Sequence, residues 1–231
     1  MKMKWIWGAA VLVSAFACGR KQPDPGALSS LERDIIRLSD SVMYVLNVAD
    51  KADSVVLRTP CVDFSDAALQ GPEFQALAEK MLATVSAVEQ GGVGIAAPQV
   101  GISHRVIAVC RLDKEGEPFE IYPNVRIDSL YGGTTHGPEG CLSIPPLRGL
   151  VPRRTDVMIS YKDPKTLQVQ RDTISGYTAV IFQHECDHLD GILYTDRADT
   201  VFYNPKWAEE RAPFAAQGRY DKPAWMKELG R

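Results

Sequence analysis

The sequence lacks the features that mark several large classes of protein. Its formal net charge is only −3 over 231 residues, so it has no basic excess of the kind that binds nucleic acid, and we expect no nucleic-acid partner. It has no internal repeat, no low-complexity run and no Gly-Lys-Ser/Thr sequence of a phosphate-binding loop. With 45% hydrophobic residues, the chain is long enough for one sizeable domain with extensions.

A short segment, Gln-His-Glu-Cys-Asp-His at 183–188, carries the strongest signal for chemistry. On a helix, His184 and His188 lie one turn apart on the same face, where they can hold one metal ion. Glu185 starts on the same turn and can reach a water at that metal as general base. The apolar run at 177–182 favours a helix buried on most of its surface. The alternative is a chance His-Glu-x-x-His pattern on a solvated helix.

A second segment, 137–146, places Cys141 between glycines and prolines, which favours a loop or a strand edge. Two histidines on a helix lack a third ligand. A thiolate from such a loop would complete a three-ligand site with one position open to water. The alternative is an inert buried cysteine.

A third segment, Gly-Gly-Val-Gly-Ile-Ala-Ala-Pro-Gln at 91–99, is rich in small residues. The glycine spacing of a dinucleotide-binding loop is absent, which makes nucleotide binding a weak interpretation. The small residues instead allow a backbone to pass close to a ligand, and Gln99 offers an amide donor at the end of the segment.

Together the three segments resemble the motifs of peptide deformylases: Gly-Φ-Gly-Φ-Ala-Ala-x-Gln, Glu-Gly-Cys-Leu-Ser and Gln-His-Glu-x-Asp-His. The resemblance covers residues 55–200, where 57–60 resembles the family's opening strand and 189–197 its closing helix. Cys186 departs from the pattern, because many members have Met there. In this chain the motifs span 92–99, 139–143 and 183–188.

The residues themselves indicate metal-assisted amide hydrolysis, with Cys141, His184 and His188 as ligands and Glu185 moving the proton. The resemblance narrows the amide to the formyl group of N-terminal formylmethionine in peptides, which is released as formate. A thiolate and two imidazoles suit several divalent ions, including Zn(II), Fe(II), Ni(II) and Co(II). The resemblance favours one Fe(II) ion, with Zn(II) as the alternative.

The resemblance also implies roles for the surrounding residues. The Gln99 side chain and the Leu142 backbone N–H would donate to the oxyanion, and Arg153 would pair with Glu139 inside the fold. An apolar pocket that includes Leu142 would take the methionine side chain, and Arg148 would lie near the peptide backbone, although an exposed charge is nearly as good an interpretation of it. The substrate-binding residues are therefore predicted to be Val93, Gly94, Arg148, Val180 and Ile181.

Two other functions fit the same residues. One is an exported metal-dependent peptidase or amidase, since an exported protein meets no nascent formylated chains. The other is a lipoprotein module that binds formylated peptides with a relic site, although the intact ligands and Glu185 count against it.

The N-terminus resembles a bacterial lipoprotein signal. Lys2 and Lys4 precede an uncharged apolar run of 13 residues at 5–17, which is too short to span a bilayer but fits a signal peptide, and Cys18 follows it as the residue that would carry lipid. We therefore expect a lipoprotein anchored to the cell membrane, on the periplasmic or outer face. The alternative is a cytoplasmic protein whose N-terminus forms a buried or interfacial helix.

The predicted organisation is a signal peptide at 1–17, a lipid-anchor tether with an added helix at 18–50, and a deformylase-like catalytic domain at 51–231. The added helix would run from 30 to 49, where apolar residues recur at helical spacing. We expect a monomer. If Cys18 carries lipid and Cys141 binds metal, an odd number of cysteines remains, which argues against disulfides. The remaining cysteines would be buried thiols at Cys61, Cys110 and Cys186.

The core has a mixed pattern. A helical pattern at 74–89 precedes several strand-like runs, and the helix with the histidines follows them. Strands grouped before a late helix predict an α+β fold with antiparallel sheets packed around a central metal-binding helix. The tail from residue 200 onward remains undecided. The strand-like runs lie at 105–111, 118–127, 156–161 and 169–174.

Overall fold

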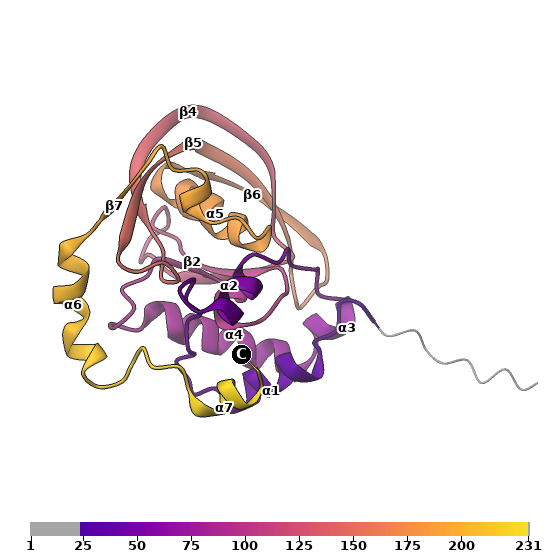
Figure 1. The fold of residues 1–231 in the computed structure, drawn as a ribbon. Helices are drawn as coiled ribbons and strands as arrows, with labels where there is room; N and C mark the ends of the chain where they lie inside the picture. The colour runs from indigo at the N-terminus through magenta and orange to yellow at the C-terminus, as the bar shows by residue number, and fades with distance from the viewer. Residues whose placement is uncertain (1–23, 231) are drawn as a thin grey trace, which may run out of the picture.

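Two antiparallel sheets enclose one buried helix, α5 (Gly176–Leu189), at the centre of the fold (Figure 1). The computed structural model describes residues 24–230. The strands are β1 (Gly94–Ala96), β2 (Val106–Cys110), β3 (Phe119–Pro123), β4 (Arg126–Gly140), β5 (Leu147–Lys162), β6 (Val169–Ser175) and β7 (Thr200–Tyr203). The other α-helices are α1 (Ser30–Leu38), α2 (Lys51–Leu57), α3 (Asp66–Leu69), α4 (Pro72–Ser86), α6 (Pro205–Ala215) and α7 (Ala224–Glu228). Two short 3₁₀ helices are η1 (Ala97–Val100) and η2 (Tyr194–Asp196).

The smaller sheet has the strand order β1-β2-β3, which leaves β1 at an edge. The larger sheet has the order β4-β5-β6, and β7 pairs with the first part of β5. All of these pairs are antiparallel. Apolar residues of both sheets pack against α5, including Ile107 from β2, Ile159 from β5 and Phe182 from the helix. The predicted α+β fold with antiparallel sheets around a central helix is confirmed.

Helix α5 is buried on almost every side. Every residue from 178 to 189 is buried, and these include polar as well as apolar side chains. The helix therefore has no solvent face of the kind seen in a surface helix. Its buried polar side chains need partners inside the protein, because an unpaired polar group in the interior costs about 1–3 kcal/mol.

A second core lies between α4 and the N-terminal segment. Ile35 and Ile36 of α1 pack there with Leu77 and Met81 of α4, and Leu46 joins them. The N-terminal segment is thus part of the same packed body as α4. A capping box at Ser29 starts α1, since its hydroxyl accepts from Glu32 N–H and the Glu32 carboxylate accepts from Ser29 N–H.

The prediction of one helix from 30 to 49 is wrong, because α1 ends at Leu38. Ser39 takes an extended backbone conformation, and its hydroxyl bonds back to the Ile35 carbonyl at 2.7 Å, which competes with continuation of the helix. The residues beyond it reach the core outside any helix. Met43 N–H, for example, donates to the Thr84 hydroxyl at 2.8 Å.

Two further local predictions are wrong. The predicted opening strand at 57–60 is instead the end of α2 and the turn after it; Asp50 caps that helix by accepting from the backbone at 52 and 53. The predicted closing helix at 189–197 is a turn followed by η2. Gly191, at φ +72°, ends the helical path there, since a left-handed residue commonly terminates an α-helix.

The chain after β7 forms two helices, and α7 closes against the N-terminal core. Met226 is buried in that core, and Lys222 donates to Asp53 at 2.6 Å and to Asp50 at 2.9 Å. Among residues 24–230 no helix is both long and apolar enough to cross a membrane. The predicted signal peptide and Cys18 lie outside the described residues.

The remaining cysteines are free thiols within the described part of the chain. Cys110 and Cys186 are buried, as predicted, and burial raises the pKa of both thiols. Cys61 is only half-buried, which corrects the prediction of a buried thiol there.

Glu32 connects α1 to the loop before β2, and this contact generates a pH prediction. Its carboxylate accepts from Ser103 N–H at 2.8 Å and lies 3.6 Å from the His104 ring. Burial opposes ionisation, but His104 and the hydrogen bonds from Ser29 outweigh it and lower the pKa of Glu32 from 4.5 to about 2. The stabilisation is therefore present above pH 4.5 and is lost as the pH falls toward 2.

We expect Glu32→Gln to lower the free energy of unfolding at neutral pH by on the order of 3 kcal/mol. The difference from wild type should shrink as the pH falls from 4.5 toward 2, because over this range the Glu32 carboxyl of the unfolded chain is protonated while that of the folded chain is still ionised. Urea unfolding at a series of pH values measures this difference, with the exposed Glu79→Gln on α4 as the matched control. A difference that stays constant with pH would show that the charge of Glu32 is not its source.

Candidate metal centre and substrate cleft

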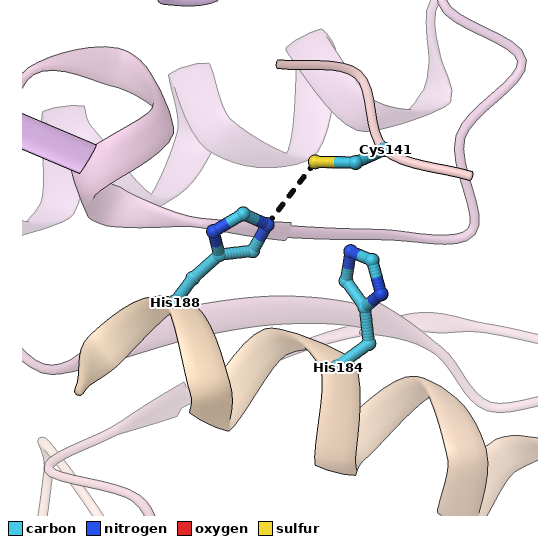
Figure 2. Close-up of side chains that lie close together, drawn as sticks. All are labelled: Cys141, His184 and His188. Carbon is cyan, nitrogen blue, oxygen red and sulfur yellow. Dashed lines mark hydrogen bonds between the residues drawn. The ribbon is translucent and has the colours of Figure 1, made fainter. Parts of the chain in front are cut away.

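Two histidines of α5 meet a cysteine that lies more than forty residues earlier in the sequence. Cys141, His184 and His188 each offer one ligand atom, and these atoms all lie within 4.8 Å of one another. Figure 2 shows both imidazoles rising from one side of the helix toward Cys141 on a separate segment. The Cys141 Sγ lies 3.2 Å from the His188 Nε2. The structure thus brings together the three predicted ligands.

The local sequence explains this placement. A spacing of four residues puts the two histidines one helical turn apart, with ring centroids 5.1 Å from each other. Strand β4 ends at Gly140, and the next residues form a tight turn in which Ile144 N–H donates to the Cys141 carbonyl at 3.1 Å. The thiol therefore lies at the end of a strand that β5 holds in register.

A buried ionic network orients His184. Its Nδ1 lies 2.8 Å from a Glu139 oxygen, so the imidazole presents Nε2 to the site. Arg153 donates to both Glu139 oxygens at 2.7 and 3.0 Å, which confirms the predicted pair, and also to Asp187 at 2.6 Å. Arg197 holds the same Asp187 carboxylate at 2.7 Å. Burial opposes the charge of Glu139, but the bonds from His184 and Arg153 lower its pKa to about 2.

Polar donors surround the Cys141 sulfur. Gln99 Nε2 lies 3.4 Å from Sγ and 3.2 Å from the Ser143 hydroxyl, while Ser143 N–H lies 3.4 Å from Sγ. The side-chain oxygen of Gln99 accepts a hydrogen bond from Ala96 N–H at 2.9 Å, which fixes the orientation of the amide. The Cys141 sulfur thus lies where two N–H groups can donate to it.

Glu185 is buried beside the same three side chains. One of its oxygens, Oε2, has no hydrogen-bond partner among the residues that the structure describes. Burial raises the pKa of this carboxyl to about 7, although His184 pulls in the opposite direction. Gly94 leaves the space for it: a Cβ there would lie 2.5 Å from Oε1 of Glu185 and 2.8 Å from Ile181. Such a raised pKa in a cleft is typical of a proton-transfer group.

A cavity of about 260 Å³ opens over these residues. Every site residue predicted from sequence lines it except His188, whose Nε2 contacts the Cys141 Sγ. Arg148 lies with its guanidinium against Gly140, where a Cβ would come within 2.6–2.8 Å of it. The predicted residues in the lining are Val93, Gly94, Gln99, Cys141, Leu142, Arg148, Val180, Ile181, His184 and Glu185.

Helix α6 contributes a wall of the cavity that was not predicted from the sequence. Trp207 and Arg211 of this helix line the same cavity, and Tyr177 joins them from the first turn of α5. The only available sequence signal was the spacing of four residues between Trp207 and Arg211, which puts both side chains on one helix face.

The donor set fits a divalent metal ion. Bonds of about 2.3 Å to sulfur and 2.0–2.1 Å to nitrogen in a tetrahedral site place ligand atoms about 3.5 Å apart. The measured separations, all within 4.8 Å, are of that size. Three protein ligands leave one coordination position for water or substrate, which is the arrangement of catalytic rather than structural sites.

Comparison with known proteins connects this geometry to one family. The chain matches the model of the family described as polypeptide deformylase over residues 44–209. A peptide deformylase of Leptospira biflexa is 34% identical over 154 residues, which cover 64% of this chain and 84% of the relative.

Solved structures extend the comparison to three dimensions. A class I type b peptide deformylase from Acinetobacter baumannii with Met-Ala-Ser bound has a TM-score of 0.59 and 34% identity, over 68% of this chain and 98% of that one. A peptide deformylase from Synechococcus elongatus in complex with actinonin has a TM-score of 0.58 and 29% identity, over 81% of this chain and 95% of that one.

We expect Cys141→Ser to weaken metal retention, because a hydroxyl rarely ionises to coordinate as a thiolate does. The loss should exceed the roughly 10- to 100-fold that follows removal of an outer hydrogen bond. Competition with a chelating dye measures it, with Cys110→Ser as the matched control. Full metal content together with an unchanged cobalt absorption spectrum would exclude Cys141 as a ligand.

Proposed function

The chain belongs to the peptide deformylase family, and we propose how its own residues carry out the reaction of that family. The enzyme removes the N-formyl group from N-terminal formylmethionine of peptides by metal-dependent hydrolysis and releases formate. The observation that carries the proposal is the buried Glu185 carboxylate, with one oxygen free, beside Cys141, His184 and His188. A divalent ion held by those three side chains would polarise the formyl carbonyl and make water more acidic.

Glu185 acts as the proton shuttle. Its carboxylate takes a proton from the water that attacks the formyl carbon and returns that proton to the leaving nitrogen. Two features support this role. Burial raises its pKa to about 7, so the carboxyl can both accept and give up a proton near neutral pH. The Glu185 carboxyl also has room at this position because Gly94, which lies against it, has no side chain.

Gln99 and Leu142 stabilise the negative charge that develops on the formyl oxygen. The Gln99 amide is already oriented by its bonds to Ala96 and Ser143 and lies beside Cys141. Leu142 N–H makes no hydrogen bond within residues 24–230 and is adjacent to the same cysteine. Removing one such donor typically costs about 3 kcal/mol of transition-state stabilisation.

The cavity accommodates the methionine side chain against apolar residues. Val93, Leu142, Val180 and Ile181 supply that surface. The edge of β1 at Gly94 is available for pairing with an extended peptide backbone, since β1 pairs with β2 on its other side. Arg148, which also lines the cavity, would lie near the backbone of the bound peptide.

The ion that we propose is Fe(II), with Zn(II) as the alternative. A thiolate and two imidazoles bind both ions. The choice of Fe(II) rests on the resemblance to deformylases, and we propose a monomer as the active form.

We further propose that the enzyme is a lipoprotein anchored to the cell membrane through Cys18, on the periplasmic or outer face. Support comes from the two lysines and the 13-residue apolar run that precede Cys18. Two or more acyl chains would hold the domain at a membrane stably, whereas one chain would not. Its substrates there would be formylated peptides or exported chains.

We expect Glu185→Gln to retain its metal but to release formate from formyl-Met-Ala about 10²- to 10⁴-fold more slowly than wild type, because the base is lost and the ligands remain. The exposed Glu115→Gln is the matched control. For the wild type, kcat/KM should fall as the pH drops below the pKa of Glu185, which burial raises to about 7 in the metal-free site. Activity of Glu185→Gln within tenfold of wild type would exclude the shuttle role.

We expect the wild-type chain in cells to take up labelled palmitate and to fractionate with membranes, because Cys18 is the acylated residue in this proposal. Cys18→Ala should lose the label. Cys61→Ala, as the control, should keep it. An unlabelled soluble protein that begins at Met1 would overturn the anchoring proposal and favour the cytoplasmic alternative.

A further inference from the structure

Helix α6 brings two large side chains to the rim of the catalytic cavity. It lies to one side of the two sheets, between β7 and the α7 segment (Figure 1). Trp207 and Arg211 both line the cavity, and the Arg211 guanidinium lies 5.8 Å from the Trp207 ring centroid. Arg211 also donates to the carbonyls of Glu89 and Gln90, just before the cavity-lining glycines. Helix α6 is therefore attached directly to the segment that leads into β1.

A second hollow of about 100 Å³ adjoins the catalytic cavity. The two share Leu142, Pro145, Trp207 and Arg211, so a peptide that leaves the catalytic cavity across these residues enters the second hollow. The remainder of its lining consists of Tyr44, Val45, Asn47, Gln90, Arg219 and Tyr220. We call this hollow the arginine subsite.

The arginine subsite carries positive charge, and the charge of Arg211 has no carboxylate partner in the described chain. Its lining includes two arginines and no carboxylate. Arg211 bonds only to backbone carbonyls and to the Tyr220 hydroxyl and forms no ion pair within residues 24–230. Arg219 is 56% exposed, and its one ion pair in the described chain is with Glu89 at 3.9 Å. Guanidinium groups have five donors each, so both arginines keep N–H groups available for a ligand.

We propose that the arginine subsite binds the C-terminal carboxylate of a short formylated peptide whose N-terminus lies at the metal centre. The inference rests on the deformylase function proposed above. Guanidinium groups pair with carboxylates through charge-assisted hydrogen bonds, and Trp207 offers an apolar face to the residue before the carboxylate. A long chain places no terminal carboxylate at this distance, so short peptides are the substrate class that the subsite selects.

Both arginines of the subsite lie outside the family match. Arg211, Arg219 and Tyr220 all follow residue 209, where that match ends. The preference for short free acids is therefore expected to be a property of this chain's C-terminal segment rather than of the catalytic core.

The test compares kcat/KM for formyl-Met-Ala, formyl-Met-Ala-Ala and formyl-Met-Ala-Ala-Ala, each as free acid and as C-terminal amide. At one or more of these lengths, kcat/KM for the acid should exceed that for the amide by about fivefold or more, mainly through a lower KM. This size is expected because partly exposed ion pairs contribute up to about 1 kcal/mol. The advantage should decrease as salt is added, since salt screens exposed charges. Equal values for acid and amide at every length would overturn the inference.

Variants identify the groups responsible. Arg219→Gln and Arg211→Gln should each reduce the ratio of kcat/KM for the free acid to kcat/KM for the amide. Arg171→Gln, an exposed arginine on β6, should leave the ratio unchanged. If Arg211→Gln fails to fold, Arg219→Gln alone provides the test, because Arg219 is exposed and its replacement leaves the core intact. If Arg219→Gln, and Arg211→Gln where it folds, keep the wild-type ratio of acid to amide, the two arginines do not bind the carboxylate and the assignment is wrong.

One further substrate distinguishes recognition of a C-terminal carboxylate from recognition of an acidic side chain. Formyl-Met-Ala-Glu amide carries the charge on a side chain, and it should remain as slow as the alanine amide of equal length. If it is the faster substrate and the free acids are not, the subsite reads acidic side chains and the proposed C-terminal recognition is wrong. Absence of formate release from every substrate would instead count against the deformylase function itself.

Discussion

The site depends on the buried guanidinium of Arg153. It bridges Glu139, on β4, and Asp187, on α5, at 2.6–3.0 Å, and Glu139 in turn holds His184. Loss of one partner from such a buried network typically costs about 3–5 kcal/mol, because the remaining charges stay desolvated and unpaired. The network therefore fixes the strand that ends before the cysteine against the helix that carries both histidines.

This constraint explains why a central helix without a solvent face can carry catalytic groups. Polar side chains of α5 are buried together with its apolar ones, and Gln183, His184 and Asp187 bond to β4 or β5. Gln183, for example, both donates to and accepts from the backbone of Arg154 on β5. Within the described chain His188 Nδ1 lacks a partner, and so does one oxygen of Glu185. The free oxygen and raised pKa of Glu185 distinguish the group that reacts from the groups that support it.

Fixed spacings made the centre of the site predictable from sequence. Two histidines four apart, a cysteine between glycines and prolines, and a glycine-rich run before Gln99 each fix a local geometry, and the sheets bring the three together. The fold class followed from the order of strand-like and helical patterns. The α+β architecture and the pair of Arg153 with Glu139 agree with those expectations.

Features that depend on tertiary contacts were not predictable in the same way. Strand β4 is exposed at most positions, so it lacks the alternation of buried and exposed residues that marks a strand. The helix predicted at 30–49 failed because Ser39 bonds its own helix end and the apolar residues after it pack outside any helix. Trp207 and Arg211 were missed because only folding of the tail brings them to the cavity.

The most direct test of the account is formate release by the chain stripped of metal and then reloaded with Fe(II) or Zn(II). With formyl-Met-Ala as substrate, the stripped chain should be inactive and the reloaded chain active, while acetyl-Met-Ala should remain intact in both. Equal formate release with and without metal, or equal hydrolysis of the acetyl and formyl peptides, would contradict a metal-dependent deformylase built on Cys141, His184, His188 and Glu185.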